Sequence, residues 1–204
     1  MAGTLLHIAA SPRGEASNSR KYGSRLAEGL CAALDLARIE RDLAASPLPP
    51  LAAAFAEASL MPESARTASH RTALLVSERL IAELEQAAIV VIDTPMHNFT
   101  VPASLKLWID HVVRPERTFR STPQGKIGLL RDRPVFAIVA SGGPLAGNGA
   151  QHDYLVPYLR YIFATMGIGD FRALTLDRLR RGEAEIASRD AMAQAWIAQQ
   201  IERD

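Results

Sequence analysis

Short apolar runs alternate along this chain with longer segments in which apolar side chains recur at helical spacing. Runs rich in β-branched residues predict strands buried on both faces of a sheet, and amphipathic segments predict helices that cover those faces. We expect strands at 4–10, 38–43, 88–93, 134–140 and 171–176. We expect helices at 17–36, 51–58, 72–87, 102–113, 155–166 and 183–202, with an irregular or hairpin-like segment at 113–130.

Strands that alternate with helices indicate an α/β fold, with a parallel sheet, right-handed crossovers and helices on both faces. We find no internal repeat and no linker, so residues 1–204 are expected to form one domain. The length favours a five-stranded, flavodoxin-like sheet of order 2-1-3-4-5 over a six-stranded dinucleotide fold. The G-x-G-x-x-G turn of the latter is also missing after the first strand, where Ser11-Pro12-Arg13-Gly14 follows.

Composition narrows the class of protein. The 204 residues are 48% hydrophobic with a formal net charge of +1, which argues against a nucleic-acid partner, since such proteins carry a basic face. No apolar run is long enough to span a membrane, and the N-terminus does not resemble a signal peptide. Cys31 is the single cysteine, so an intramolecular disulfide is impossible, and the dispersed histidines do not suggest a metal site. We therefore expect a cytoplasmic protein without a membrane partner.

The loop after the first strand is the first candidate binding segment. It leads into a helix, and a helix N-terminus attracts anions through its unpaired N–H groups and its dipole. Ser11, Ser17, Asn18 and Ser19 add hydroxyl and amide groups suited to phosphate oxygens. The alternative is that Ser17 or Ser19 merely caps the helix.

Two further strand ends carry ligand-type sequences. Pro95, Met96, His97, Asn98 and Phe99 follow the 88–93 strand, where Pro95 should stop the ladder and the apolar side chains offer soft and flat surfaces. A turn containing Ser141, Gly142 and Gly143 follows the 134–140 strand, and paired glycines let a ligand approach the backbone closely. The alternative in both cases is an ordinary connection. In a flavodoxin-like sheet these three loops share one rim, so a phosphate on the first and a flat ring across the others would describe FMN.

The same motifs resemble those of a known family. The chain is similar to the FMN-dependent NADH-azoreductases, which are flavodoxin-like quinone reductases, over almost its full length. The matching segments are Ser11 with Ser17-Asn18-Ser19, Pro95 to Phe99, Leu105 to Asp110, Thr118 to Thr122, and Pro157-Tyr158-Leu159.

The resemblance implies an FMN oxidoreductase. FMN would be bound tightly but non-covalently, NADH or NADPH would donate electrons, and quinones or aromatic azo compounds would accept two electrons in a ping-pong sequence. The flavin would carry the chemistry, without a catalytic side chain or a metal. The implied homodimer would let Phe119, Tyr158 and Phe163 close the substrate site from a second subunit; alternatively, these rings fill the core of their own chain. A flavodoxin-type electron carrier without a substrate pocket is the competing function.

The chain departs from the family pattern at two places. His97 replaces the usual tyrosine of the P-M-Y-N-F turn, and Ala140-Ser141-Gly142-Gly143 replaces the usual S-R-G-G, so the arginine is absent. A histidine changes charge between pH 5 and 8, so His97 is a candidate for tuning the redox potential. The alternative is that it packs as a neutral substitute for tyrosine.

Overall fold

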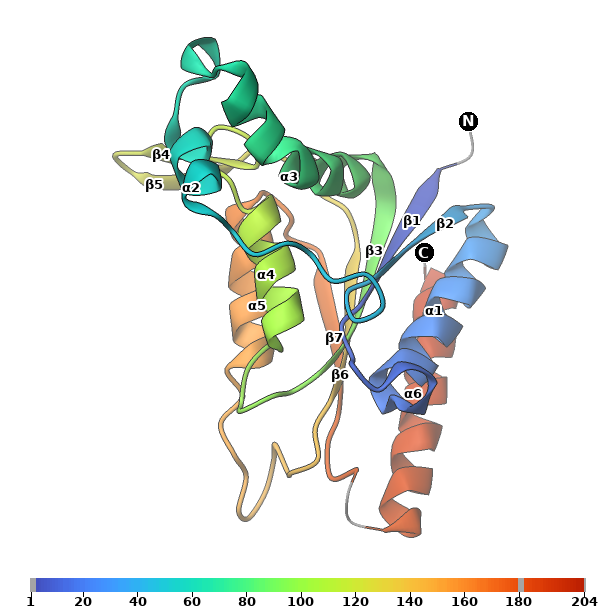
Figure 1. The fold of residues 1–204 in the computed structure, drawn as a ribbon. Helices are drawn as coiled ribbons and strands as arrows, with labels where there is room; N and C mark the ends of the chain where they lie inside the picture. Colours follow the sequence, from blue (N-terminus) through green and yellow to red (C-terminus); the bar gives the residue numbers. More distant parts are fainter. Residues whose placement is uncertain (1–2, 180–181, 204) are drawn as a thin grey trace.

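The central element is a five-stranded parallel sheet. The computed structural model describes residues 3–179 and 182–203. The sheet has the order β2-β1-β3-β6-β7 (Figure 1). Its strands are β1 (Thr4–Ala9), β2 (Ala37–Asp42), β3 (Ala87–Pro95), β6 (Val135–Ala140) and β7 (Phe171–Leu176). A separate hairpin consists of β4 (Phe119–Thr122) and β5 (Gly125–Gly128). Counted without this hairpin, the sheet strands follow the expected order 2-1-3-4-5.

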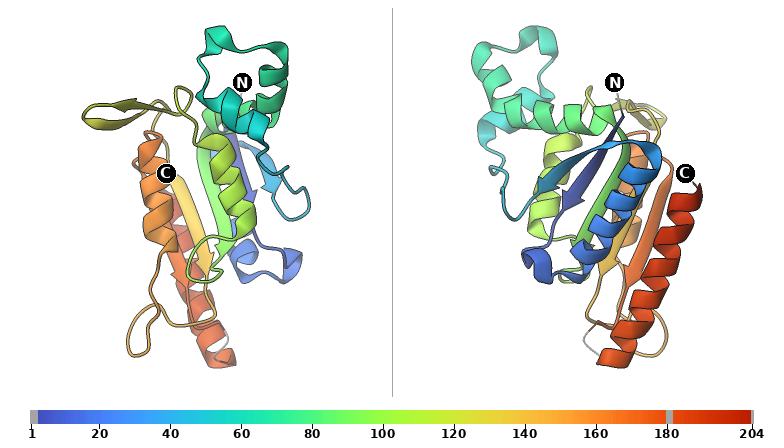
Figure 2. Two further views of the ribbon diagram at one scale, coloured as in Figure 1. Left: turned by 60° about the vertical axis from the view of Figure 1, so that its left-hand side comes forward. Right: turned by 90° about the vertical axis from the view of Figure 1, so that its right-hand side faces the viewer.

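Helices cover both faces of the sheet (Figures 1 and 2). The first face packs against α1 (Asn18–Leu34) and α6 (Glu183–Arg203). The second packs against α3 (Ala68–Gln86), α4 (Ala103–Val112) and α5 (Leu155–Thr165). The smaller helices are α2 (Ala53–Leu60), which packs on α3, and the 3₁₀ turns η1 (Gly14–Ala16) and η2 (Glu63–Ala65). Because all five strands are parallel, their carboxyl ends share one rim of the sheet.

Most elements lie within about two residues of their predicted bounds, and the differences at α3 and β3 have a clear physical reason. Helix α3 begins at Ala68 because Thr67 and His70 form a capping box. The Thr67 hydroxyl accepts from the His70 N–H, and the His70 ring accepts from the Thr67 N–H, a task that usually falls to glutamate. Strand β3 continues to Pro95, which we expected to stop it; the ladder is prolonged because the next N–H, that of Met96, donates to the Ala140 carbonyl at 2.8 Å.

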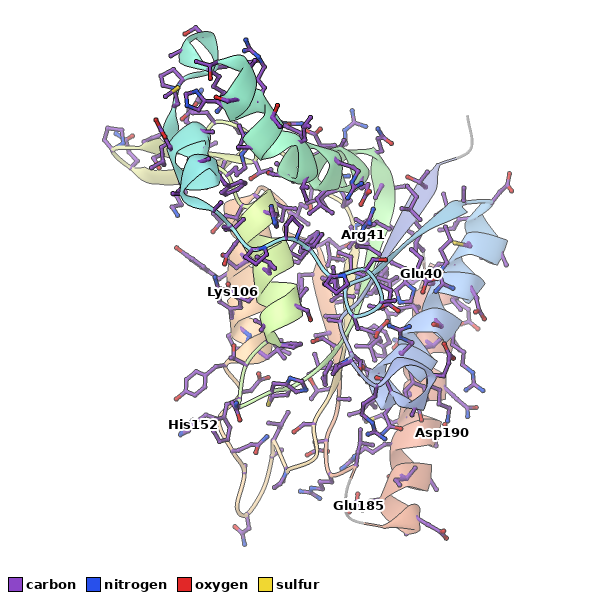
Figure 3. The ribbon with its side chains drawn as sticks, viewed as in Figure 1. Glu40, Arg41, Lys106, His152, Glu185 and Asp190 are labelled. Atoms are coloured by element: carbon purple, nitrogen blue, oxygen red, sulfur yellow. The ribbon has the colours of Figure 1, made fainter. Side chains whose placement is uncertain are left out.

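Polar contacts tie the two helices of the first face, α1 and α6, to each other. Asp190 of α6 lies beside the first turns of α1 (Figure 3). Its carboxylate accepts from Lys21 Nζ and from the Tyr22 hydroxyl, both at 2.7 Å.

Within the described residues, no helix is long and apolar enough to cross a membrane.

Candidate functional site

Two adjoining hollows lie at the carboxyl rim of the sheet, where the loops after β1, β3 and β6 meet. The smaller has a volume of about 150 Å³ and the larger of about 440 Å³, and they share Met96, Ser141 and Gly142. The smaller is lined further by Ser11, Arg13, Ser17, Asn18, Pro95, His97, Ala140 and Leu179. The larger is lined further by Asn98, Phe99, Gly143 and Gln151. Of the predicted cofactor-binding residues, only Ser19 does not line either hollow.

The smaller hollow has the features of an anion site. Ser17 is the N-cap of α1, and its hydroxyl accepts from the Arg20 N–H. The backbone N–H groups of Asn18 and Ser19, at the start of the helix, have no acceptor within the described part of the chain. Unpaired donors at the positive end of a helix are suited to phosphate oxygens. Capping and anion binding are thus compatible here.

Ser19 and Arg20 lie behind this loop rather than in it. The Ser19 hydroxyl is fully buried and lies 3.0 Å from that of Ser17, so Ser19 orients Ser17. Arg20 is 8% exposed, and its Nη1 lies 2.7 Å from an Asp42 carboxylate oxygen. This hydrogen-bonded ion pair raises the pKa of Arg20 and lowers the pKa of Asp42 to about 2. Two other guanidinium nitrogens of Arg20, Nε and Nη2, are buried without a partner among the described residues.

The turn after β3 has an unusual backbone. Asn98 and Phe99 have φ angles of 47° and 72°, a region that phenylalanine rarely adopts and that often marks a binding site. His97 and Thr100 hold the turn, because each N–H donates to the other's carbonyl, at 2.9 and 3.0 Å. None of the described residues accepts from the N–H groups of Asn98 and Phe99. The Phe99 ring is 49% exposed beside the larger hollow.

The turn after β6 is fixed from both sides. The Ser141 N–H donates to the Leu176 carbonyl at 2.8 Å, and its hydroxyl donates to the Gly143 carbonyl at 3.1 Å. A Cβ on Gly143 would lie 2.8 Å from Gln151 Oε1, so the Gln151 side chain packs closely against this turn. The N–H groups of Gly142 and Gly143 have no acceptor within 3–179 and 182–203. Gln151 itself was missed by the sequence analysis, because a glutamine in a polar loop carries no pattern.

Comparison with known proteins places this geometry in a family. A family described as having a flavodoxin-like fold matches residues 3–200. A Cupriavidus pinatubonensis protein, FMN-dependent NADH:quinone oxidoreductase 2, is 50% identical over 194 residues, 94% of each chain. FMN-dependent NADH:quinone oxidoreductase 4 of Pseudomonas fluorescens is 47% identical over 188 residues, 89% of this chain and 87% of the other. This chain belongs to the flavodoxin-like FMN-dependent NADH:quinone oxidoreductase family.

Solved structures agree on the fold of this family member. The azoreductase AzrA has a TM-score of 0.88 at 22% identity, over 99% of this chain and 100% of that one. An FMN-dependent NADH-azoreductase from Bacillus anthracis, solved with FMN, has a TM-score of 0.84 at 23% identity, over 98% of each chain.

The three predicted substrate-contacting rings do not line the rim hollows of this quinone oxidoreductase family member. Phe163 is fully buried, with its ring 6.5 Å from that of Trp108 and 5.8 Å from that of Phe171. It fills the core of its own chain, which supports the alternative interpretation of this ring. Phe119, 6% exposed, lies in β4 beneath Lys126, at the end of the molecule away from the rim (Figure 1). Tyr158 is half-buried on α5.

Proposed function

We propose that this chain is an FMN-dependent NADH:quinone oxidoreductase. It binds FMN tightly without a covalent bond, takes electrons from NADH or NADPH, and passes two electrons to quinones and aromatic azo compounds in a ping-pong sequence. The observation that carries the proposal is the continuous pair of rim hollows, one with a helix N-terminus and the other flanked by unpaired backbone donors. The names of its close relatives point to the same cofactor, donor and acceptor class.

The residues at the rim suit FMN. Bound flavin supplies the redox chemistry, since its ring takes up and releases electron pairs. Ser11, Ser17 and the N–H groups of Asn18 and Ser19 would hold the phosphate, with the Arg20 charge behind them. The 95–99 and 141–143 turns would flank the ring. Their unpaired N–H groups would stabilise negative charge there, a form of preorganised electrostatic stabilisation that requires neither a nucleophile nor a metal.

Two measurements test this function. Purified protein should be yellow with flavin absorbance, and it should oxidise NADH in the presence of benzoquinone or an aromatic azo dye. Reciprocal plots at several acceptor concentrations should be parallel if the sequence is ping-pong. A flavodoxin-type carrier would hold flavin but show little turnover, whereas colourless protein that binds no added FMN would contradict the cofactor assignment itself.

We also propose a homodimer that covers the α4–α5 face. Tyr154, Tyr158 and Tyr161 follow each other at helical spacing, and Tyr154 and Tyr161 are 59% and 68% exposed. The adjacent hairpin exposes Ile127 by 47%. Such clustered apolar side chains are typical of protein interfaces. A C₂ dimer would place residues of one chain near the rim of the other.

Sedimentation velocity tests the dimer. Tyr161→Asp should shift the parent dimer towards monomer. Ile186→Asp, on the opposite helix layer and 41% exposed in the parent, should leave it unchanged. A fully active monomeric parent would contradict the proposal.

We also propose that the chain forms a single cytoplasmic domain that binds neither nucleic acid nor membranes. A near-neutral charge and a lone, partly buried Cys31 support one cytoplasmic domain without nucleic-acid or membrane partners. Fractionation of cells would test the cytoplasmic location. Full activity after washing in high salt would test the absence of nucleic-acid and membrane partners.

A further inference from the structure

The side-chain amide of Gln151 joins two of the three rim turns. Its Nε2 lies 3.0 Å from the Ser141 Oγ, in the turn after β6. The same nitrogen lies 3.5 Å from the Met96 Sδ, in the turn after β3. Gln151 lines the larger hollow and is partly buried. One side chain thus spans the two segments between which the proposed cofactor ring would lie.

The hydrogen-bond partners fix which way this amide faces. Ser141 has a single hydroxyl hydrogen, which it donates to the Gly143 carbonyl, so its Oγ can only accept from Gln151. A thioether sulfur also only accepts, so Met96 requires a donor as well. The NH₂ group of the Gln151 amide therefore faces both Ser141 and Met96. The carbonyl oxygen Oε1 is left against Gly143, where a Cβ would lie 2.8 Å from it.

The backbone holds Gln151 in this place. Its N–H donates to the Pro144 carbonyl at 3.0 Å, which closes the loop back onto the turn after β6. That turn is also anchored to the chain after β7, because the Leu179 N–H donates to the Ser141 carbonyl at 3.3 Å. These two hydrogen bonds hold the backbone on either side of the Gln151 amide in place.

We propose that Gln151 is a positioning residue for the cofactor ring. Through Met96 and Ser141 it sets the separation and orientation of the two turns that flank the ring. This inference rests on the proposed function, because it concerns the same site. It also gives a physical reason for Ser141 at a position where the resembling family has arginine. The Ser141 hydroxyl accepts a hydrogen bond from the Gln151 amide, whereas a guanidinium group can only donate.

A double-mutant cycle tests this coupling. Gln151→Leu removes both donated hydrogen bonds, and Ser141→Ala removes one acceptor. Each variant should bind FMN about tenfold more weakly in a fluorescence titration, the change that about 1.4 kcal/mol produces. The double variant should lose less than the product of the two single effects, because the same contact cannot be lost twice. His152→Leu, an exposed position in the same loop, should bind FMN as the parent does.

Gln151→Glu separates positioning from general loss of structure. A carboxylate cannot donate to Met96 or Ser141, so its FMN affinity should fall as in Gln151→Leu. Its negative charge beside the ring should also lower the midpoint potential of bound FMN below that of Gln151→Leu. A residue that only stabilised the loop at a distance from the ring would not separate the two potentials.

The outcomes distinguish this proposal from the proposed function. Parent protein that binds no FMN would overturn both. Parent protein that binds FMN, with Gln151→Leu equal to it in affinity and with Gln151→Glu equal to Gln151→Leu in potential, would overturn the role of Gln151 alone. Strictly multiplicative effects in the Gln151–Ser141 cycle would also overturn it.

Discussion

His7 Nε2 and Asp93 Oδ2 lie 2.7 Å apart, and neither side chain is exposed to solvent. Arg38 Nη2 lies 2.6 Å from the other ring nitrogen of His7. An arginine can only donate, so Nδ1 accepts, and Nε2 carries the hydrogen that it donates to Asp93. These contacts link β2, β1 and β3. They lie beneath the candidate site, because Asp93 is only two residues before Pro95.

Loss of the His7–Asp93 bond should destabilise the fold. We expect His7→Leu to lower the free energy of unfolding by about 1.5–3 kcal/mol, the range for a hydrogen bond to a charged group, because it leaves a buried carboxylate unpaired. Urea denaturation followed by circular dichroism measures the change. His152→Leu, at an exposed loop position, should stay within about 0.5 kcal/mol of the parent. Equal stability of the two variants would contradict the interpretation.

Gly23 gives α1 its close approach to Asp93. A Cβ at residue 23 would lie 2.6 Å from the Asp93 Cβ, an atom fixed to its strand. Gly23→Ala should therefore destabilise by about 1–3 kcal/mol, as overpacking does. Gly29→Ala is the matched control in the same helix, since its new Cβ would meet only the flexible end of Ile201. That variant should be neutral or slightly more stable because alanine favours a helix; the reverse order of stabilities would refute the packing argument.

Alternation of apolar runs with amphipathic segments sufficed to predict the sheet, its winding and the position of the rim, because these depend on local periodicity and on the rules for parallel connections. The loops at the rim were also predictable, since they must follow particular strands. Pairings between distant residues were not. Neither the partnership of His7 with Asp93 nor that of Gln151 with Met96 leaves a pattern in one sequence. The position of Phe163 could not be predicted either, because the sequence looks the same whether an aromatic residue on a helix faces a substrate or the core.

Asp42 should make stability depend on pH in the acid range. Arg20 lowers the pKa of Asp42 to about 2 in the folded chain, below the ordinary aspartate value of 3.8. The folded state therefore binds this proton less readily than the unfolded state, and the ion pair stabilises by about 2 kcal/mol above roughly pH 4. That contribution is lost as the pH falls from about 4 towards 2.

Asp42→Asn measures this contribution. Its stability deficit relative to the parent, from urea denaturation, should be constant between pH 7 and 5 and should shrink as the pH is lowered through 4 to 3. A deficit that does not change with pH would show that the Asp42 charge is not the cause.

Removal of the serine hydroxyls at the start of α1 should weaken cofactor binding. We expect Ser17→Ala combined with Ser19→Ala to lower FMN affinity, at about 0.5–1.5 kcal/mol per neutral hydrogen bond, as measured by fluorescence titration. The N-cap is lost as well, which costs about 1 kcal/mol of stability. Thr67→Ala is the control, because it removes the N-cap of α3 away from the rim. It should lower stability similarly and leave FMN affinity unchanged, whereas unchanged affinity in the serine variant would exclude phosphate anchoring.

His97 replaces the tyrosine that the resembling family has in the turn after β3. The structure places it at the smaller hollow with an exposed side chain. Its backbone pairs with Thr100, so a change of side chain should leave the turn intact. A protonated imidazole there would favour the more negatively charged reduced cofactor and raise its midpoint potential as the pH falls. The effect should be modest, because solvent and salt screen an exposed charge.

His97→Tyr restores an aromatic ring without this titration. We expect the variant to bind FMN as the parent does and to lose one pH-dependent contribution to the midpoint potential between pH 5 and 8. Spectroelectrochemical titration of both proteins measures that contribution as a difference between two curves, so the proton coupling of the flavin itself cancels. The difference should also shrink as salt is added, since the charge is exposed. Superimposable curves at low salt would mean that His97 only replaces the tyrosine sterically.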